Sequence, residues 1–214
     1  MTVQIKDVIT YDKENHPTKS DVLAQFFKKY PKKRPKKKRR FSALWRGYTC
    51  RTEITDNKLY IRSLSFVSSK PHGSALYDSF KKTFPNPQDH FLDWFSGIII
   101  IGTEPNPDHP NSHRGFPIYE VNQLLEVIDG TLTQTRTFSY DELETFRKKQ
   151  FQLFKSTDDF VQLKNEEIAR INKENELIKN ASEELGQFSL RTFSESDFEH
   201  TIELRLFDYV KKFY

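Results

Sequence analysis

The basic side chains of this sequence are concentrated in one stretch near the N-terminus. Ten of its 34 Lys and Arg residues lie between Lys28 and Arg40. The densest part of the stretch consists of Lys32, Lys33, Arg34, Lys36, Lys37, Lys38, Arg39 and Arg40. Cations at this density neutralise phosphates and release counterions, which is typical of salt-sensitive, sequence-independent binding to nucleic acid. No aromatic residue lies within 32–40, so this stretch by itself offers no ring on which a base could stack.

Two other interpretations of the basic stretch remain open. An acidic protein surface would suit it equally well, because complementary charge also guides protein association. The stretch could also be a solvated loop without a specific partner. Without its ten basic residues the net charge of +4 becomes −6, so the rest of the chain is mildly acidic. Pro31 and Pro35 interrupt any helix, and we expect an exposed, extended loop over 31–40.

A second group with possible chemistry, Asp108, His109 and His113, lies in a proline-rich stretch. Carboxylate and imidazole groups bind metal ions, so these residues are a weak candidate for a metal site. Their spacing matches no structural zinc pattern, and Asn, Asp, Pro and His are also common in turns. The sequence gives no reason to expect a bound cofactor.

Both tryptophans lie in segments that could meet around a small pocket. The candidate pocket residues are Trp45, Arg46, Tyr48, Asp93 and Trp94. Gly47, placed inside a predicted strand, indicates a bulge or a close approach of two backbones. Arg46 could pair with Asp93 or with Glu53. The alternative interpretation is a packed core that contains one satisfied ion pair.

Residues suited to nucleophilic catalysis are few. The single cysteine, Cys50, is predicted to lie on the buried face of a strand, where a thiol is inert. No serine lies in a nucleophile-elbow motif, and the seven glycines form no phosphate-binding loop. The sequence therefore favours a protein that is not an enzyme.

The composition predicts a globular protein of the cytoplasm that does not contact a membrane. Hydrophobic residues make up 36% of the chain, and 19 phenylalanines supply material for a core. The longest apolar run is 98–101, far short of the ~18 residues that cross a membrane. The first residues lack the basic-then-apolar pattern of a signal peptide.

Two β-hairpins are the clearest predicted elements. Segments 41–55 and 58–66 are rich in aromatic and β-branched residues and flank Asp56-Asn57, a suitable two-residue turn. Alternation along the first segment places on one face Tyr48, Cys50, Thr52 and Ile54. Segments 116–128 and 131–138 flank Asp129-Gly130 in the same way, and a buried strand over 97–103 precedes them.

Helical patterns dominate the C-terminal third. Ser139 and Glu142 form a capping box before a predicted helix over 140–155. A longer helix is expected over 158–185, with Lys164 and Asn175 interrupting its thin apolar stripe. The tail, 196–214, is predicted to be a helix capped by Ser196. Shorter helices are expected over 21–30 and 75–82.

Together these elements predict an α+β fold, in which an antiparallel meandering β-sheet is followed by a C-terminal helical region. Residues 1–138 would form a mostly β core with the basic loop at 31–40. Residues 139–214 would form a helical region that packs on this core or projects from it, and we expect one domain overall.

Three motifs of the sequence resemble those of a family of small uncharacterised bacterial proteins. The motifs are WRGY at 45–48, DNKLYI at 56–61 and DWFSG at 93–97. In that family a strand with a WRGY core enters a hairpin, and a D-W-F-[ST]-G segment follows. The likeness covers roughly 41–138, and the basic stretch and the helices after Ser139 depart from it. It implies bacterial origin and a sheet core, and it transfers no catalytic residue.

The features of the sequence favour a non-enzymatic protein that binds another protein. A toxin-neutralising immunity protein and an accessory protein of a bacterial defence system are two forms that fit. The first alternative is a nucleic-acid-binding module that uses residues 28–40. The second is a metal-dependent hydrolase or nuclease, which would need Asp108, His109 and His113.

Overall fold

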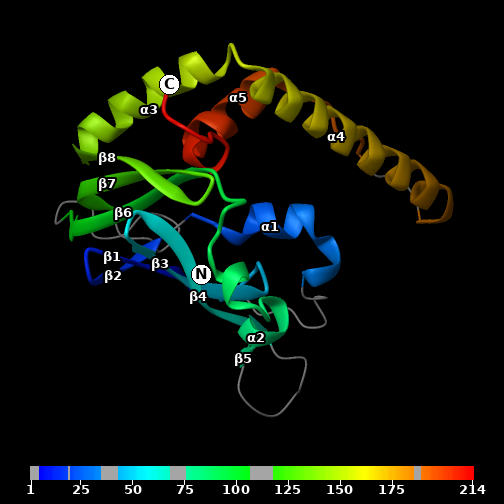
Figure 1. The fold of residues 1–214 in the computed structure, drawn as a ribbon. Helices are drawn as coiled ribbons and strands as arrows, with labels where there is room; N and C mark the ends of the chain where they lie inside the picture. Colours follow the sequence, from blue (N-terminus) through cyan, green and yellow to red (C-terminus); the bar gives the residue numbers. More distant parts are fainter. Residues whose placement is uncertain (1–4, 19, 35–42, 68–75, 107–117, 186–188) are drawn as a thin grey trace. The chain divides into compact units, whose positions relative to one another are not determined.

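The computed structural model describes residues 5–18, 20–34, 43–67, 76–106, 118–185 and 189–214 (Figure 1). Its contacts divide the chain into two compact units. Unit 1 comprises Met1–Leu143 together with Val210–Phe213, and unit 2 comprises Glu144–Tyr209 together with Tyr214. Unit 1 is rich in strands, whereas unit 2 is helical.

The described part of unit 1 contains eight strands, seven of which close into a barrel. They are β1 (Asp7–Tyr11), β2 (Glu14–Thr18), β3 (Tyr48–Thr55), β4 (Lys58–Val67), β5 (Leu76–Asp78), β6 (Gly97–Pro105), β7 (Tyr119–Ile128) and β8 (Thr131–Ser139). Their order is β3-β1-β2-β6-β7-β8-β4-β5, and β3 also pairs with β4, which closes the ring and leaves β5 attached to β4 (Figure 1).

The α+β prediction is confirmed, but the purely antiparallel meandering sheet is wrong. Strand β1 pairs in parallel with β3, so the barrel is mixed. The hairpin of β1 and β2 lies between β3 and β6, which joins two parts of the sheet that a meander would leave apart. Strand β2 has the sequence ENHPT, and with its polar residues and Pro17 it lacks the pattern from which a strand is predicted.

Three tight turns give the barrel its hairpins. The predicted turns Asp56-Asn57 and Asp129-Gly130 have positive φ at both residues, as a two-residue hairpin turn requires. A third such turn, Asp12-Lys13, joins β1 to β2 with φ of 49° and 68°. The sequence did not reveal it, because Lys rarely adopts positive φ.

Side chains fill the interior of the barrel. Eight of the fully buried ones are Ile9, Leu59, Ile61, Leu64, Ile99, Ile101, Leu125 and Val127. The predicted inward face of β3 is confirmed, since Tyr48, Cys50 and Thr52 are buried and Ile54 packs against the core. The barrel therefore has a packed core.

Short helices cover part of this core. Helix α1 (Leu23–Lys29) buries Leu23, Phe26 and Phe27, and the 3₁₀ turn η1 (Pro31–Lys33) follows it. The expected helix over 75–82 is instead strand β5 followed by the short helix α2 (Phe80–Thr83). A second 3₁₀ turn, η2 (Pro87–His90), leads toward β6.

The C-terminal helices largely match the prediction. They are α3 (Tyr140–Phe154), α4 (Asp158–Leu185), α5 (Glu195–Leu204) and the 3₁₀ turn η3 (Leu206–Asp208). The capping box of α3 is confirmed: the backbone N–H of Ser139 donates to Glu142, and that of Glu142 donates to Ser139 Oγ. The tail helix differs, because Ser194 rather than Ser196 caps α5 and the helix ends at Leu204.

The two polar residues that interrupt the apolar stripe of α4 hold the chain that returns along this helix. The Asn175 amide donates to the carbonyl of Arg191 and accepts from its N–H, at 2.8 and 2.9 Å. The Lys164 ammonium pairs with Glu195 and lies 5.9 Å from the ring centre of Phe193. Their positions in the stripe therefore have a structural reason.

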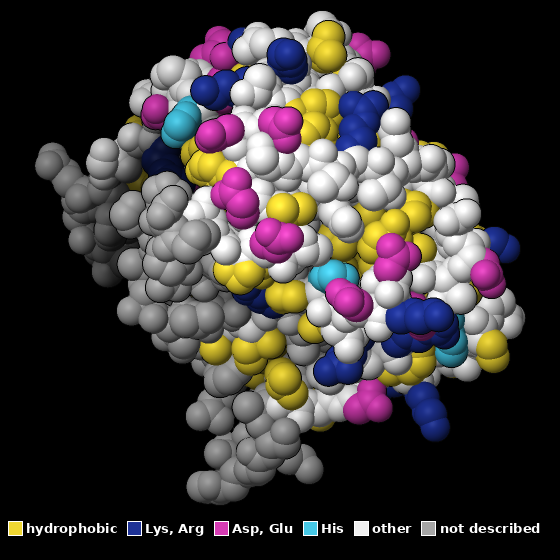
Figure 2. All heavy atoms as spheres, turned by 90° about the vertical axis from the view of Figure 1, so that its left-hand side faces the viewer, with side chains coloured by type: hydrophobic (Ala, Val, Ile, Leu, Met, Phe, Trp, Pro, Cys, Tyr) yellow, Lys and Arg dark blue, Asp and Glu magenta, His cyan; other side chains and the backbone are white. Residues whose placement is uncertain are grey.

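None of the helices in the described ranges is both long and apolar enough to cross a membrane. On the face of the molecule that Figure 2 shows, acidic, basic and hydrophobic side chains are interspersed, and neither sign of charge dominates.

Candidate functional site

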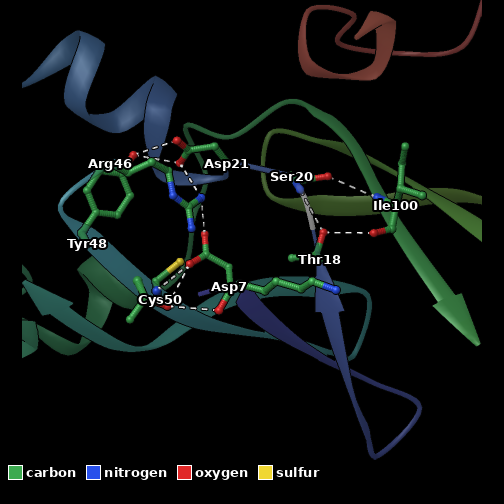
Figure 3. Close-up of polar contacts among 10 residues, drawn as sticks. Asp7, Thr18, Ser20, Asp21, Arg46, Tyr48, Cys50 and Ile100 are labelled. Atoms are coloured by element: carbon green, nitrogen blue, oxygen red, sulfur yellow. Dashed lines mark hydrogen bonds and ion pairs between the residues drawn. The ribbon is translucent and has the colours of Figure 1, made fainter. Parts of the chain in front are cut away.

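A buried ion pair joins β1 to the chain just before β3 (Figure 3). Asp7 is 1% exposed, and its carboxylate accepts from Arg46 at 2.9 Å, from the N–H of Cys50 at 2.9 Å and from the Thr49 hydroxyl at 3.2 Å. On the other side of Arg46, the Asp21 carboxylate lies 3.7 Å from the guanidinium and accepts from the Tyr48 hydroxyl. One arginine therefore bridges two carboxylates.

The surroundings of this network perturb its ionisable groups. Burial raises the pKa of the Asp7 carboxyl, while the Arg46 guanidinium and the N–H of Cys50 act in the opposite direction. Burial and the nearby Asp21 carboxylate raise the pKa of Tyr48, so its hydroxyl stays a donor. Burial, followed by the charge of Asp7, raises the pKa of the Cys50 thiol. Cys50 is therefore held as an unreactive thiol at neutral pH.

The contacts of this network suit structural stabilisation. Both oxygens of the Asp7 carboxylate accept hydrogen bonds, and both oxygens of Asp21 accept from Tyr48 at 2.8 and 2.9 Å. Satisfied groups of this kind fix the register and orientation of the elements that carry them. The network therefore holds β1 against the start of β3, its parallel neighbour in the barrel.

The structure brings together only part of the predicted pocket. Arg46 and Tyr48 are adjacent, with the guanidinium 5.3 Å from the ring centre. Asp93 is exposed, and Trp94 packs 5.2 Å from Phe26. The expected pairing of Arg46 with Asp93 or Glu53 is wrong.

The actual partners of Arg46 come from the N-terminal third of unit 1. They are Asp7 and Asp21, whereas Glu53 pairs with Arg62 on the neighbouring strand. Asp7 was missed because it lies 39 residues before Arg46 in the sequence. No local pattern in the sequence connects these two residues.

A second group of side chains forms what we call the basic surface. It consists of Lys29, Lys32, Lys33 and Arg34 around η1 and of Lys81 and Lys82 on α2, all exposed. The two segments are in contact, because the Lys33 ammonium donates to the carbonyl of Thr83 at 3.2 Å and Phe26 packs on Phe84. Sequence reasoning missed Lys81 and Lys82, which lie about 50 residues from the basic stretch. The remaining predicted residues, Lys36, Lys37, Lys38, Arg39 and Arg40, lie outside the described ranges.

Within the described part of the chain, none of the six cations of the basic surface forms an ion pair. Cations elsewhere are often neutralised: in unit 2, Arg170 pairs with Glu167 and Glu174, and Arg205 pairs with Asp208. The basic surface thus concentrates positive charge that forms no ion pair with a described carboxylate. Such a surface attracts polyanions at long range, and added salt weakens the attraction.

Three aromatic side chains of unit 1 are strongly exposed in the described ranges, and two of them, Tyr30 and Tyr77, lie in segments that carry or adjoin the basic surface. The exposed fractions are 41% for Tyr30, 72% for Trp45 and 47% for Tyr77, and no other aromatic residue is among the large exposed hydrophobic residues of the described ranges. Tyr30 packs 5.0 Å from Phe26, while Tyr77 packs against Phe66.

Ring contacts connect the surroundings of these aromatics to α1. Phe66 lies 6.4 Å from Phe27 of α1, and Tyr48, three residues after Trp45, lies 4.8 Å from the same ring. Separate segments supply the three rings: Tyr30 belongs to the basic stretch, Trp45 to the chain before β3 and Tyr77 to β5, and no local signal in the sequence groups them.

Unit 2 contains a shallow groove of about 630 Å³ between α4, the returning chain and α5. Ile171, Phe198 and Ile202 are among the residues that line it. Its three arginines are Arg170, Arg191 and Arg205, and each of them pairs with a carboxylate. The groove therefore presents no arginine charge that lacks a partner.

The candidate metal ligands Asp108, His109 and His113 lie outside the described ranges. Among the residues that are described, no group of three or more His, Cys, Asp or Glu side chains is placed to hold a metal ion. No family model, curated protein or solved structure matches this chain. The resemblance to small bacterial proteins stays a prediction, and the geometry of the described surface is the basis for a functional proposal.

Proposed function

We propose that this chain is a non-enzymatic binding protein that docks a negatively charged macromolecule on the basic surface. The observation that supports the proposal is the group of six exposed cations without ion pairs on two contacting segments. Clustered like charges repel each other in the free protein. A polyanion relieves that repulsion, and it gains affinity through the release of its own counterions.

The charge distribution of the sequence agrees with this proposal. Unit 2 contains 10 basic and 14 acidic residues, which gives −4, so unit 1 has a net charge of +8 within a total of +4. The excess positive charge therefore belongs to the unit that carries the basic surface. Charge of one sign in one unit speeds association with partners of the opposite sign.

The inward-facing polar groups support binding over catalysis. Asp7 and Asp21 are hydrogen-bonded and share Arg46, and the Cys50 thiol is buried with a raised pKa. A catalytic group needs free access to a reacting atom and a pKa matched to its task. None of these groups has both, and in the described ranges no other cluster suggests a hydrolase.

The features of the sequence favour a protein partner, with an immunity protein or a defence-system accessory as the suggested form. In that case the partner would present an acidic face to the basic surface. The alternative, nucleic acid, presents the same sign of charge through its phosphates. Charge alone fits both partners, so the first test addresses the polyanion-binding surface without assuming either one.

Charge reversal on α2 provides this test. The double variant Lys81→Glu/Lys82→Glu should elute from a heparin column at a lower salt concentration than the wild-type protein. The control is Lys148→Glu/Lys149→Glu, which changes the net charge equally at two exposed lysines of unit 2. If the two variants elute together, net charge alone governs retention and the basic surface is not the contact site.

A further inference from the structure

We infer that the partner is a single-stranded nucleic acid, whose phosphates contact the basic surface and whose bases stack on Tyr30, Trp45 and Tyr77. This inference rests on the proposed function and specifies its partner. Proteins that bind single strands without sequence preference combine a positive track for the backbone with aromatic rings for the bases. The end of unit 1 around α1 has both components.

The exposed aromatics distinguish this end from a surface that is merely basic. Burying large aromatic rings is strongly favourable, so their exposure in a folded chain often marks an interaction site. Trp45, one of the two tryptophans of the chain, has 72% of its surface exposed to solvent. The other tryptophan, Trp94, is partly buried against Phe26 and Phe95.

Two cations of the basic surface lie close to one of these rings. Lys29 and Lys33 lie 5.5 and 5.6 Å from the ring centre of Tyr30, so charge and ring share one location. Tyr77 is four residues before Lys81, and the carbonyl of Thr83 on α2 accepts from Lys33. The cations and two of the rings, Tyr30 and Tyr77, thus lie on β5, α2, η1 and the end of α1.

A single strand fits this arrangement better than a duplex does. The bases of a duplex are stacked on each other, and their faces are not available to exposed protein rings. A single strand exposes its bases, and every base has a face that can stack on an aromatic ring, which makes such binding tolerant of sequence. An acidic protein would match the cations, although tyrosine and tryptophan also anchor protein interfaces. That partner is therefore an outcome of the test.

The test measures fluorescence anisotropy of a labelled oligodeoxythymidine of about 20 nucleotides, longer than typical single-strand sites. A duplex of the same length is measured in parallel, and both are titrated with the full chain over a range of salt concentrations. We expect the single strand to bind more tightly than the duplex. Lys81→Ala/Lys82→Ala should flatten the logarithmic salt dependence by about 1.4, or roughly 0.7 for each lost phosphate contact.

The aromatic variants separate stacking from charge. Trp45→Ala and Tyr77→Ala should each weaken binding by about 5- to 150-fold and leave the salt dependence unchanged. Trp45→Phe and Tyr77→Phe should restore most of the affinity, because they keep a ring at each position. The same two variants are also controls for misfolding. Lys148→Ala/Lys149→Ala is the charge control. Leu204→Ala, at a residue that is 52% exposed in unit 2, is the apolar control.

Each result decides the inference. Equal or tighter binding of the duplex would overturn it, and so would alanine variants of Trp45 and Tyr77 that bind like the wild-type protein. If this happens while Lys81→Glu/Lys82→Glu still lowers retention on heparin, the basic surface binds a different polyanion, such as an acidic protein. If heparin retention is unchanged as well, the proposed function fails together with the inference.

Discussion

Replacing Arg46 with methionine removes the charge partner of a buried carboxylate and keeps most of the apolar volume of the side chain. The side chains of Asp7 and Arg46 are 2% and 25% exposed, so the ion pair is largely shielded from water. Breaking a buried pair by removing one partner costs about 3–5 kcal/mol. We expect about 3 kcal/mol for Arg46→Met, since the arginine is partly exposed and Asp7 keeps its bonds to Cys50 and Thr49.

The same substitution on the surface is the matched control. Arg62 pairs with Glu53, but these side chains are 47% and 32% exposed. Exposed pairs contribute about 0–1 kcal/mol, so Arg62→Met should lower the free energy of unfolding by less than about 1 kcal/mol. Urea unfolding followed by tryptophan fluorescence suits both variants, because Trp45 and Trp94 both report on unit 1.

Two further measurements sharpen this prediction. Removing both charges in Asp7→Asn/Arg46→Met should restore part of the stability lost in Arg46→Met, since no buried charge is then left without a partner. The reasoning would be refuted if Arg46→Met were as mild as Arg62→Met, or if the double variant were no more stable than Arg46→Met.

The sign of the pH dependence is a separate check on this reasoning. Burial already raises the pKa of Asp7, and Arg46 is the strongest influence that lowers it, so its loss raises that pKa further. When a carboxyl group has a higher pKa in the folded state than in the unfolded state, the protein loses stability as the pH rises from the unfolded-state pKa to the folded-state pKa. The penalty of Arg46→Met should therefore be smaller at about pH 5 than at about pH 8. A penalty that stays the same at both values would contradict a role for the Asp7 charge.

Three further perturbations test other parts of the fold. Asn175→Ala should lower the thermal midpoint of unit 2, since two hydrogen bonds to Arg191 are lost at roughly 1 kcal/mol each; an unchanged midpoint would contradict their role. Gly130→Ala should destabilise unit 1 by more than about 1 kcal/mol in urea unfolding, because φ is 74° and the added Cβ would lie 2.7 Å from the carbonyl oxygen of Leu92. Cys50 should react with a thiol reagent only as fast as the protein unfolds, and rapid labelling of the folded protein would show that the thiol is accessible.

Local chemistry explains which elements could be predicted from the sequence. Asp56-Asn57 and Asp129-Gly130 define their hairpins because positive φ at both turn residues suits these residue types. The start of α3 was predictable for a similar reason, since Ser139 and Glu142 satisfy each other's backbone N–H groups within one turn. Each of these signals acts within about four residues along the chain.

The features that could not be predicted depend on residues far apart in the sequence. Closure of the barrel requires β1 beside β3, and neither strand contains a pattern that selects the other. The partner of Arg46 was missed for the same reason. The exposed aromatic rings come from three segments, so no local pattern in the sequence groups Tyr30 with Tyr77 or Trp45.

The order of strands around the barrel has a consequence for synthesis on the ribosome. Hairpin β1–β2 is made first, but its pairing with β6 joins Thr18 to Ile101, and the last connection joins Lys58 of β4 to Thr131 of β8. The ring cannot close until Thr131 has left the ribosome, so a nascent chain that ends between β7 and β8 exposes the free edges of β7 and β4. Such edges pair readily with other chains. We therefore expect nascent chains that end before β8 to need chaperone protection or to aggregate, whereas chains that include β8 can close the barrel themselves.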